Sequence, residues 1–474
     1  MGVSRRSFIK GAATTAMVSI AGGALKPLVA AETEMKPGPG NKWPGRVVVN
    51  FNKNAVNGST VNEEIAKTMV DDAIMLLTDQ KSVGAAWKAV FPETLSASSK
   101  IAIKTNILNA GVPCPHASTV QAIIEGLLQM DLGGSKIPAA NITIYDGNNS
   151  NNFSSAKYSD DRFPGSNLVK EKTFTKYGDG ALNDRPYAKT LHDSDFLINV
   201  FSPRGHFIGN GFTLGFKSHF GTYNDASGMH GGMSKDSGID NIAEINCMGP
   251  VYKKTVLSFC SGLFGMNEGN GPTGGADPFA VYANSIDSSI DKTSKNISPT
   301  TIILSTDPVS CDMQAFKIQR INKGGSYGYA DAPGYLKIAT GLTGKSFNIG
   351  ILDEEKMDVR KIINGEIVGV GTVPPREGIF ASQKNDLTIS LSARNRTAFI
   401  EYTVSNDLVG KDASVEIYDM SGRSVYKVSQ VICGAKNHLS WNMKTSSGVS
   451  VSNGEYIVKV SAGRFRRSSS IVVR

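Results

Sequence analysis

Lysine, histidine and asparagine side chains with the means to bind or transform a ligand lie in two stretches of this sequence. Lys104 and Asn106 end an apolar run, and His206, Lys217 and His219 lie in a later stretch rich in glycine. Polar residues in such loops are placed for a ligand rather than for packing. A lysine there binds an anion, or acts as a base where burial lowers its pKa. We predict Lys104, His206, Lys217 and His219 as catalytic residues and Asn106 as a ligand-binding residue.

Metal binding is a second chemistry that the histidines allow. His206, His219 and His230 fall close together in the sequence, and neutral imidazoles are common metal ligands. Their spacings match no standard zinc motif, however. Loop histidines hydrogen-bonded to the backbone account for the same pattern. The sequence therefore leaves the metal, and any other cofactor, unknown.

Glu268, Gly269, Asn270 and Gly271 form a third candidate group, and we predict them as ligand-binding residues. They open a glycine-rich segment, whose backbone N–H groups can approach a phosphate or a carboxylate. The same residues would also suit a tight turn. The sequence contains no nucleophile elbow, no G-x-x-x-x-G-K loop and no dinucleotide fingerprint. The common hydrolase, kinase and dehydrogenase classes therefore lose support.

The elements that must position these residues alternate between strands and helices. Apolar spacing predicts helices over 61–77 and 118–129 and strands over 100–106, 141–145, 196–201 and 300–304. This alternation indicates an α/β domain with a layered, largely parallel sheet, in which ligands bind where strands end. Asp307 precedes a further predicted helix, and we rank helix capping above catalysis for its carboxylate.

The residue pattern of the sequence changes near residue 387. Short alternating strands separated by turn residues predict a small all-β sandwich of immunoglobulin-like size. We therefore divide the chain into four parts: a signal peptide (1–31), a flexible leader (32–45), an α/β domain (46–375) and a β-sandwich (386–474).

The assignment of the signal peptide rests on the order of residue types. Arg5 and Arg6, with Phe8 and Lys10 behind them, precede a short apolar run and the small residues 29–31. The arginine pair is typical of the twin-arginine export machinery, whose cargo is folded before transport. An ordinary secretory signal is the alternative, and both predict export to the periplasm, the cell surface or the medium. The apolar run is too short to serve as a membrane anchor.

Charge and cysteine content exclude several other classes. The formal net charge is +8, but four of the basic residues lie in 1–31, so the charge does not argue for a nucleic-acid partner. No later segment is apolar enough to cross a bilayer, and we do not expect an integral membrane protein. The five cysteines include no C-x-x-C pair, which removes a local iron-sulfur or zinc-ribbon motif.

Four blocks of the central region share their pattern with a known family. They are Ile101–Asn106, ending in Lys-x-Asn; 195–217, where a strand leads to His206 and then to Lys217; Gly265–Pro272, the most specific; and Ser305–Asp312. In these blocks the chain resembles the family named domain of unknown function 362, across most of residues 45–345. The resemblance implies a fold and a site but no settled reaction. Arg204 stands where relatives usually have lysine, Ser218 stands where they usually have asparagine, and the ferredoxin-like segment of many relatives is missing.

The C-terminal part carries a second resemblance. Residues 415–419, 422–423, 439–441 and 454–456 resemble the immunoglobulin-like domain of flagellar hook-capping proteins and the sorting domains of type IX secretion substrates. This implies a docking module, with an outer-membrane secretion system as a partner beside the twin-arginine machinery. A carbohydrate-binding or wall-binding sandwich is the alternative.

Two functions from different classes remain open at this stage. The first is an exported enzyme or cofactor-binding protein that acts on a small anionic ligand through the Lys/His/Asn loop site. The second is a noncatalytic surface or periplasmic binding protein, attached through its C-terminal β domain.

Overall fold

The computed structural model describes residues 42–107, 113–147, 153–179, 184–206, 211–231, 238–266, 278–341, 347–368, 387–394, 397–404, 408–419, 423–434, 436–462 and 465–473. The predicted signal peptide and most of the predicted leader fall outside these ranges. So do four predicted site residues, Glu268, Gly269, Asn270 and Gly271.

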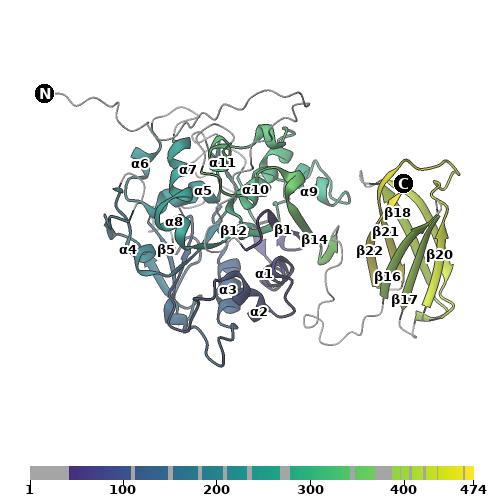
Figure 1. Cartoon of the computed structure of the whole chain (residues 1–474), viewed down its shortest axis with the longest axis horizontal. Coiled ribbons are helices and arrows are strands. Elements are labelled where there is room, and N and C mark those ends of the chain that lie inside the picture. Colours follow the sequence, from purple (N-terminus) through teal and green to yellow (C-terminus); the bar gives the residue numbers. More distant parts are fainter. Residues whose placement is uncertain are drawn as a thin grey trace, which may run out of the picture. The chain divides into compact units, whose positions relative to one another are not determined.

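A nine-stranded sheet forms the centre of the α/β domain (Figure 1). Its strands follow the order β15 (Glu366–Val368), β14 (Asp358–Ile363), β1 (Arg46–Phe51), β13 (Thr301–Ser305), β12 (Thr255–Gly262), β9 (Phe196–Phe201), β4 (Ile101–Lys104), β5 (Ile142–Asp146) and β6 (Asn167–Lys170). The strands from β12 to β6 run parallel, as do β1 and β14. Strand β13 runs antiparallel to both its neighbours, and β15 antiparallel to β14. The predicted α/β class is confirmed, with a mixed sheet whose site-bearing half is parallel.

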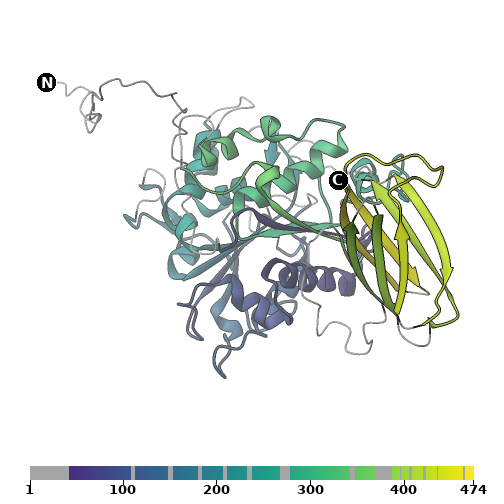
Figure 2. The same ribbon diagram turned by 45° about the vertical axis from the view of Figure 1, so that its right-hand side comes forward.

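Helices cover both faces of this sheet (Figures 1 and 2). One face carries α1 (Glu63–Thr78), α2 (Val83–Val90) and α3 (Ala117–Leu127), and the other carries α5 (Gly215–Ser218), α7 (Ile239–Cys247), α8 (Gly249–Lys254), α10 (Pro308–Asn322) and α11 (Gly334–Thr340). We call these the α1 face and the α10 face. Two hydrophobic clusters fill them, one on each side.

Side-chain alternation along the buried strands decides which face each residue serves. In β4, Ile101 and Ile103 pack on the α1 face and Ala102 on the α10 face. The same period of two sends Lys104 toward the α10 face, where its ammonium contacts the last residue of α5, Ser218. A strand buried on both faces thus delivers one charged side chain to its carboxyl end.

Shorter elements complete the α/β domain. They are β2 (Val56–Asn57), β3 (Thr60–Val61), β7 (Phe174–Thr175), β8 (Tyr187–Ala188), β10 (Arg204–Gly205), β11 (Phe212–Thr213), α4 (Lys189–Asp193), α6 (Ala226–Met229), α9 (Ala280–Ile286) and the 3₁₀ turns η1 (Ala139–Asn141), η4 (His219–Thr222), η5 (Tyr329–Asp331) and η6 (Glu354–Lys356). Across the described ranges, no helix combines the length and the apolar character that a bilayer crossing requires.

The C-terminal domain consists of two antiparallel sheets, as predicted for a β-sandwich. One contains β16 (Leu387–Arg394), β17 (Thr397–Val404) and β20 (Lys436–Trp441); the other contains β19 (Ser424–Val431), β18 (Asp412–Asp419), β21 (Gly454–Ala462) and β22 (Phe465–Val473). Trp441 is fully buried, and its ring lies 5.6 Å from that of Tyr456 in an edge-to-face contact. These two aromatic side chains anchor the sandwich core.

Candidate functional site

The carboxyl ends of three adjacent parallel strands bring charged residues to one edge of the sheet. Lys104 is the last residue of β4, Asp146 is the last residue of β5, and Arg204 follows three residues after β9. Because β9, β4 and β5 are neighbours and parallel, these residues meet where α/β sheets commonly bind ligands. Asn106, two residues past β4, is buried at the same edge.

Lys104 and Asp146 form a buried ion pair at this edge. Lys104 Nζ lies 3.0 Å from Asp146 Oδ1 and also donates to the carbonyl oxygens of Thr105 (2.6 Å) and Ser218 (3.1 Å). Both side chains are at most 1% exposed. An ammonium has three donors, and all three are taken here. Burial lowers the pKa of Lys104, and the Asp146 carboxylate opposes that effect. Lys104, which we predicted as a catalytic residue, therefore holds neighbouring protein groups together and has no N–H left to donate to a ligand.

Gly221 allows this pair to be covered closely. A Cβ atom at Gly221 would lie 2.5 Å from Asp146 Oδ1 and 3.0 Å from Lys104 Nζ. The carbonyl of Gly221 also accepts from the backbone N–H of Gly147. Only glycine permits the backbone after α5 to approach the pair at this distance.

Arg204 is the charged residue that sequence reasoning noted only as a departure from the family pattern. Its side chain is 3% exposed, and its backbone is held between Thr213 of β11 and Met266. Arg204 Nε and Nη2 are buried without a hydrogen-bond partner in the described part of the chain. These two donors occupy one edge of the guanidinium, the edge that grips a carboxylate or a phosphate with two parallel bonds.

Lys217 lies in the short helix α5, which follows the β10–β11 hairpin that contains Arg204. Thr213 pairs with Arg204 across β10 and β11, and α5 begins two residues later. The Lys217 side chain is 4% exposed, and its Nζ lies 5.9 Å from the centre of the Phe220 ring. Burial, and secondarily the positive charge of Arg204, lower the pKa of Lys217 to about 6. At neutral pH most of this amine is therefore uncharged.

Side chains of α10 and α7 hold the helix that carries Lys217 in place. Asp312 of α10 accepts the backbone N–H of Gly215 at Oδ1 (2.8 Å) and that of Phe216 at Oδ2 (3.0 Å). Asn246 of α7 donates to the carbonyl of Phe216 (2.8 Å). Burial raises the pKa of Asp312 to about 7. Neither Asp312 nor Asn246 belonged to the predicted site.

The histidines divide into two groups. The rings of His206 and His230 stack with centres 5.7 Å apart, and His230 meets Phe220 edge to face at 4.8 Å. His230 Nδ1 lies 2.7 Å from the carbonyl of Ala226, so Nδ1 carries the proton and Nε2 keeps its lone pair. His219 is fully enclosed beside Thr222, and burial lowers its pKa well below the ordinary value. His230 thus contacts the Phe220 ring that Lys217 also approaches, whereas His219 is more deeply buried.

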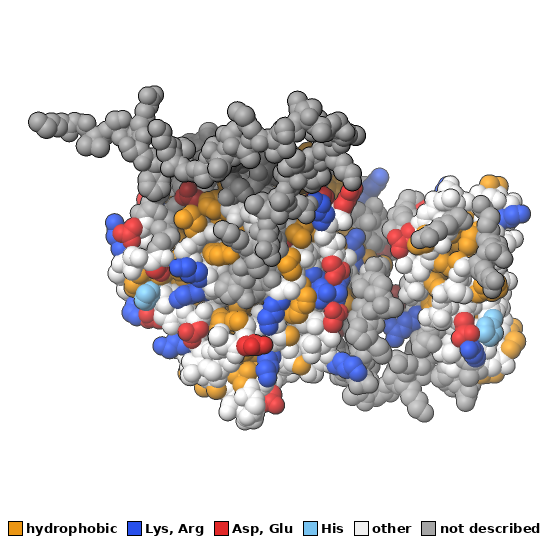
Figure 3. Space-filling model, viewed as in Figure 1, with side chains coloured by type: hydrophobic (Ala, Val, Ile, Leu, Met, Phe, Trp, Pro, Cys, Tyr) orange, Lys and Arg blue, Asp and Glu red, His pale blue; other side chains and the backbone are white. Residues whose placement is uncertain are grey.

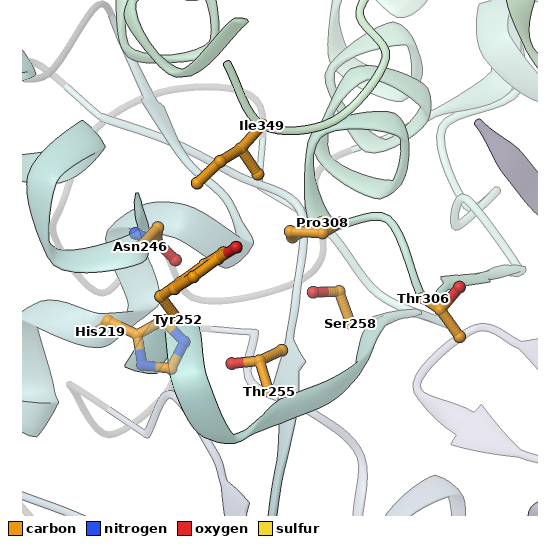
Figure 4. A pocket seen from close by; sticks show the side chains of 8 residues that line it. All are labelled: His219, Asn246, Tyr252, Thr255, Ser258, Thr306, Pro308 and Ile349. Carbon is orange, nitrogen blue, oxygen red and sulfur yellow. The ribbon is translucent and has the colours of Figure 1, made fainter. Parts of the chain in front are cut away.

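A small cavity adjoins His219 on the α10 face. It is lined by His219, Asn246, Tyr252, Thr255, Ser258, Thr306, Pro308 and Ile349 (Figure 4). Its volume of about 20 Å³ has room for about one water molecule. Tyr252 projects into the middle of this group. A metabolite does not fit there, so the buried donors of Arg204, rather than this cavity, define the candidate ligand position.

The sequence leaves metal binding open, and only the residues that the structure describes bear on it. They contain no group of three or more His, Cys, Asp or Glu side chains able to hold a metal ion. A cation would also lie close to Arg204, whose positive charge repels it. On the face shown in Figure 3, basic and acidic side chains are interspersed. The buried guanidinium of Arg204, by contrast, suits a small anion.

Residues 101–317 match the family model described as domain of unknown function (DUF362). The match covers the strand ends and the helices that carry Lys104, Arg204, Lys217 and Asp312. It confirms the predicted resemblance over a shorter span than residues 45–345. No curated protein matches the chain.

Several solved structures resemble small parts of the chain. Dimeric latent PorU from Porphyromonas gingivalis is 21% identical over 18% of this chain and 9% of its own, with a TM-score of 0.15. A β-glucuronidase from an uncultured Clostridium species is 13% identical over 19% and 15%, with a TM-score of 0.13. PorZ, a surface component of the type IX secretion system of P. gingivalis, is 17% identical over 23% and 19%, with a TM-score of 0.12. At these scores and coverages the likenesses support no functional argument.

Proposed function

We propose that the α/β domain binds a small anion with two adjacent oxygen atoms, a carboxylate or a phosphoryl group, and acts on it with Lys217. The observation that supports this is the open edge of Arg204, whose Nε and Nη2 donors are buried without partners in the described residues. Leaving buried charged donors unsatisfied is costly. A bidentate anion would satisfy both at once.

The surroundings of Arg204 favour the same ligand. Burial lowers the pKa values of Lys217 and Lys104, and the positive charge of Arg204 lowers them further. The Asp146 carboxylate is already engaged by Lys104 and by the backbone N–H of Ile107 (2.7 Å). A bound anion would place a negative charge against the Arg204 guanidinium. In this arrangement Lys104 and Asp146 position the strand ends, Arg204 holds the ligand and Lys217 reaches it.

Arg204→Gln tests the proposal on the purified mature chain. Calorimetric titration with a panel of short carboxylates and inorganic phosphate is expected to find a ligand for the wild type. The variant is expected to bind that ligand about 10- to 100-fold more weakly, because charged hydrogen bonds contribute about 1.5–3 kcal/mol. Arg423→Gln, at a side chain 78% exposed, is the control. Equal affinity for wild type and Arg204→Gln, or no binding across the panel, would contradict the proposal.

The same titration has a defined dependence on pH. A bound anion favours the charged form of Lys217. It therefore raises the pKa of Lys217 above the value of about 6 in the ligand-free protein. Binding therefore takes up a proton, and affinity falls as pH rises above 6, by at most about tenfold per pH unit. Lys217→Met is expected to remove this slope while Arg204 still binds.

Export and attachment form the second part of the proposal. We infer from Arg5 and Arg6 that the twin-arginine machinery exports the folded chain, and from the C-terminal β domain that a second sorting step delivers it to the cell surface or the medium. One fractionation experiment tests both steps. Replacing Arg5 and Arg6 by lysine is expected to keep the protein in the cytoplasm. Deleting residues 387–474 is expected to leave it in the periplasm, and an unchanged surface fraction would remove the sorting role.

A further inference from the structure

Lys217 is a buried lysine that lies beside an aromatic ring and is affected by the charge of Arg204. Its side chain is buried, its Nζ lies over the Phe220 ring, and Phe220 also contacts the His230 ring. Burial of this kind removes water from the amine, and the loss of water disfavours the charged ammonium form. It is the setting of lysines that act as nucleophiles rather than as charged contacts.

Hydrogen bonds hold the backbone around Lys217 in place. Asp312 binds the first two N–H groups of α5, and Asn246 binds a carbonyl in the same turn. Ser218 Oγ donates to Asn199 Oδ1 of β9 (2.7 Å), which ties the residue beside Lys217 to the sheet. A nucleophile held by three neighbouring elements pays little entropy to approach a bound ligand.

We propose that the anion is an oxo acid, meaning a carboxylate that bears an aldehyde or ketone group, and that Lys217 Nζ forms an imine with its carbonyl carbon. This inference rests on the proposed anion site, because Arg204 holds the carboxylate while Lys217 attacks the neighbouring carbon. The lowered pKa of Lys217 supports it, since the neutral amine is the reactive form.

The atoms balance without any further reagent. The nitrogen lone pair forms the bond to the carbonyl carbon, and the carbon–oxygen π electrons move to oxygen. The two amine protons then leave with that oxygen as one water molecule, and a C=N bond remains. Nε2 of His230, whose lone pair is left open by the Nδ1 contact, can carry a proton between nitrogen and oxygen.

Reductive trapping of the mature chain tests the inference. The protein is incubated with glyoxylate and sodium cyanoborohydride near pH 7, and each lysine is followed by peptide mass spectrometry. Lys217 is expected to become carboxymethylated at least about tenfold faster than Lys176, because a surface lysine is almost fully protonated at this pH. Lys176 is a suitable reference because its side chain is 61% exposed.

Arg204→Gln and a second probe separate this inference from the proposed anion site. In this variant, trapping of Lys217 by glyoxylate is expected to slow about tenfold. Trapping by acetaldehyde, which has no carboxylate, is expected to slow much less and to stay faster than at Lys176, because burial, the larger cause of the lowered Lys217 pKa, is kept. If wild-type Lys217 reacts no faster than Lys176 although glyoxylate binds in an Arg204-dependent manner, the imine is refuted and the anion site stands. If glyoxylate does not bind at all, both proposals fail for this ligand class, while acetaldehyde still reports the reactivity of Lys217.

Discussion

Lys104→Met is expected to lower the free energy of unfolding of the α/β domain by about 3–5 kcal/mol, the usual cost of removing one partner from a buried ion pair. The substitution leaves Asp146, which is 1% exposed, without the ammonium that lies 3.0 Å from its Oδ1. It also leaves the carbonyls of Thr105 and Ser218 without a donor. Urea unfolding followed by fluorescence and near-ultraviolet circular dichroism measures the change.

Two further variants make this test specific. Lys176→Met removes an exposed pair with Asp184 and is expected to change stability by less than about 0.5 kcal/mol. The double variant Lys104→Met/Asp146→Asn removes the uncompensated charge and keeps an acceptor for Ile107. It is therefore expected to be more stable than Lys104→Met alone. A double variant less stable than Lys104→Met would show that the ion pair is not what Lys104 supplies.

The fold was predictable where strands are apolar throughout. Residues of β4, β5, β9 and β13 form short apolar runs, and the structure contains all four within two residues of the predicted bounds at either end. Strand β12 was missed because Ser258 and Ser261 interrupt its apolar pattern. Those serines are buried because other elements bind them: Thr119 Oγ1 lies 2.9 Å from Ser261 Oγ, and Cys311 Sγ contacts the carbonyl of Ser258. The edge strand β19 was missed, and only one of its residues, Val425, is buried.

The candidate site was predictable only in part. The structure places Lys104, Asn106, His206, Lys217 and His219 in one region, as strand-end reasoning suggests. Their roles in chemistry stay predictions. The sequence could not distinguish Lys104, which is bound to Asp146 and Ser218, from Lys217, whose pKa falls to about 6, because both differences depend on residues distant in the sequence. Arg204 could have been singled out, since a charged residue directly after a buried strand and before His206 is an unusual place for a solvated side chain.

Asp307→Ala is expected to be comparably destabilising, by about 3–6 kcal/mol, because the carboxylate satisfies four buried N–H groups. Oδ1 accepts from Val309 (3.0 Å) and Ser310 (3.2 Å) at the start of α10, and Oδ2 accepts from Gly45 (3.0 Å) and Ile351 (2.9 Å). One side chain thus caps a helix and joins two distant segments to it. Burial raises the pKa of Asp307 even though these N–H groups favour its charged form.

The control is a helix-capping aspartate at the surface. Asp353 accepts one backbone N–H, that of Glu355, in an exposed contact at the start of η6, and Asp353→Ala is expected to cost about 1 kcal/mol or less. Asp307→Asn keeps one acceptor oxygen and is expected to fall between wild type and Asp307→Ala. Unfolding curves of the three variants rank them. If Asp307→Ala were as stable as Asp353→Ala but lost ligand binding or turnover, the catalytic reading of Asp307 would replace the capping one, because a cap acts on stability first.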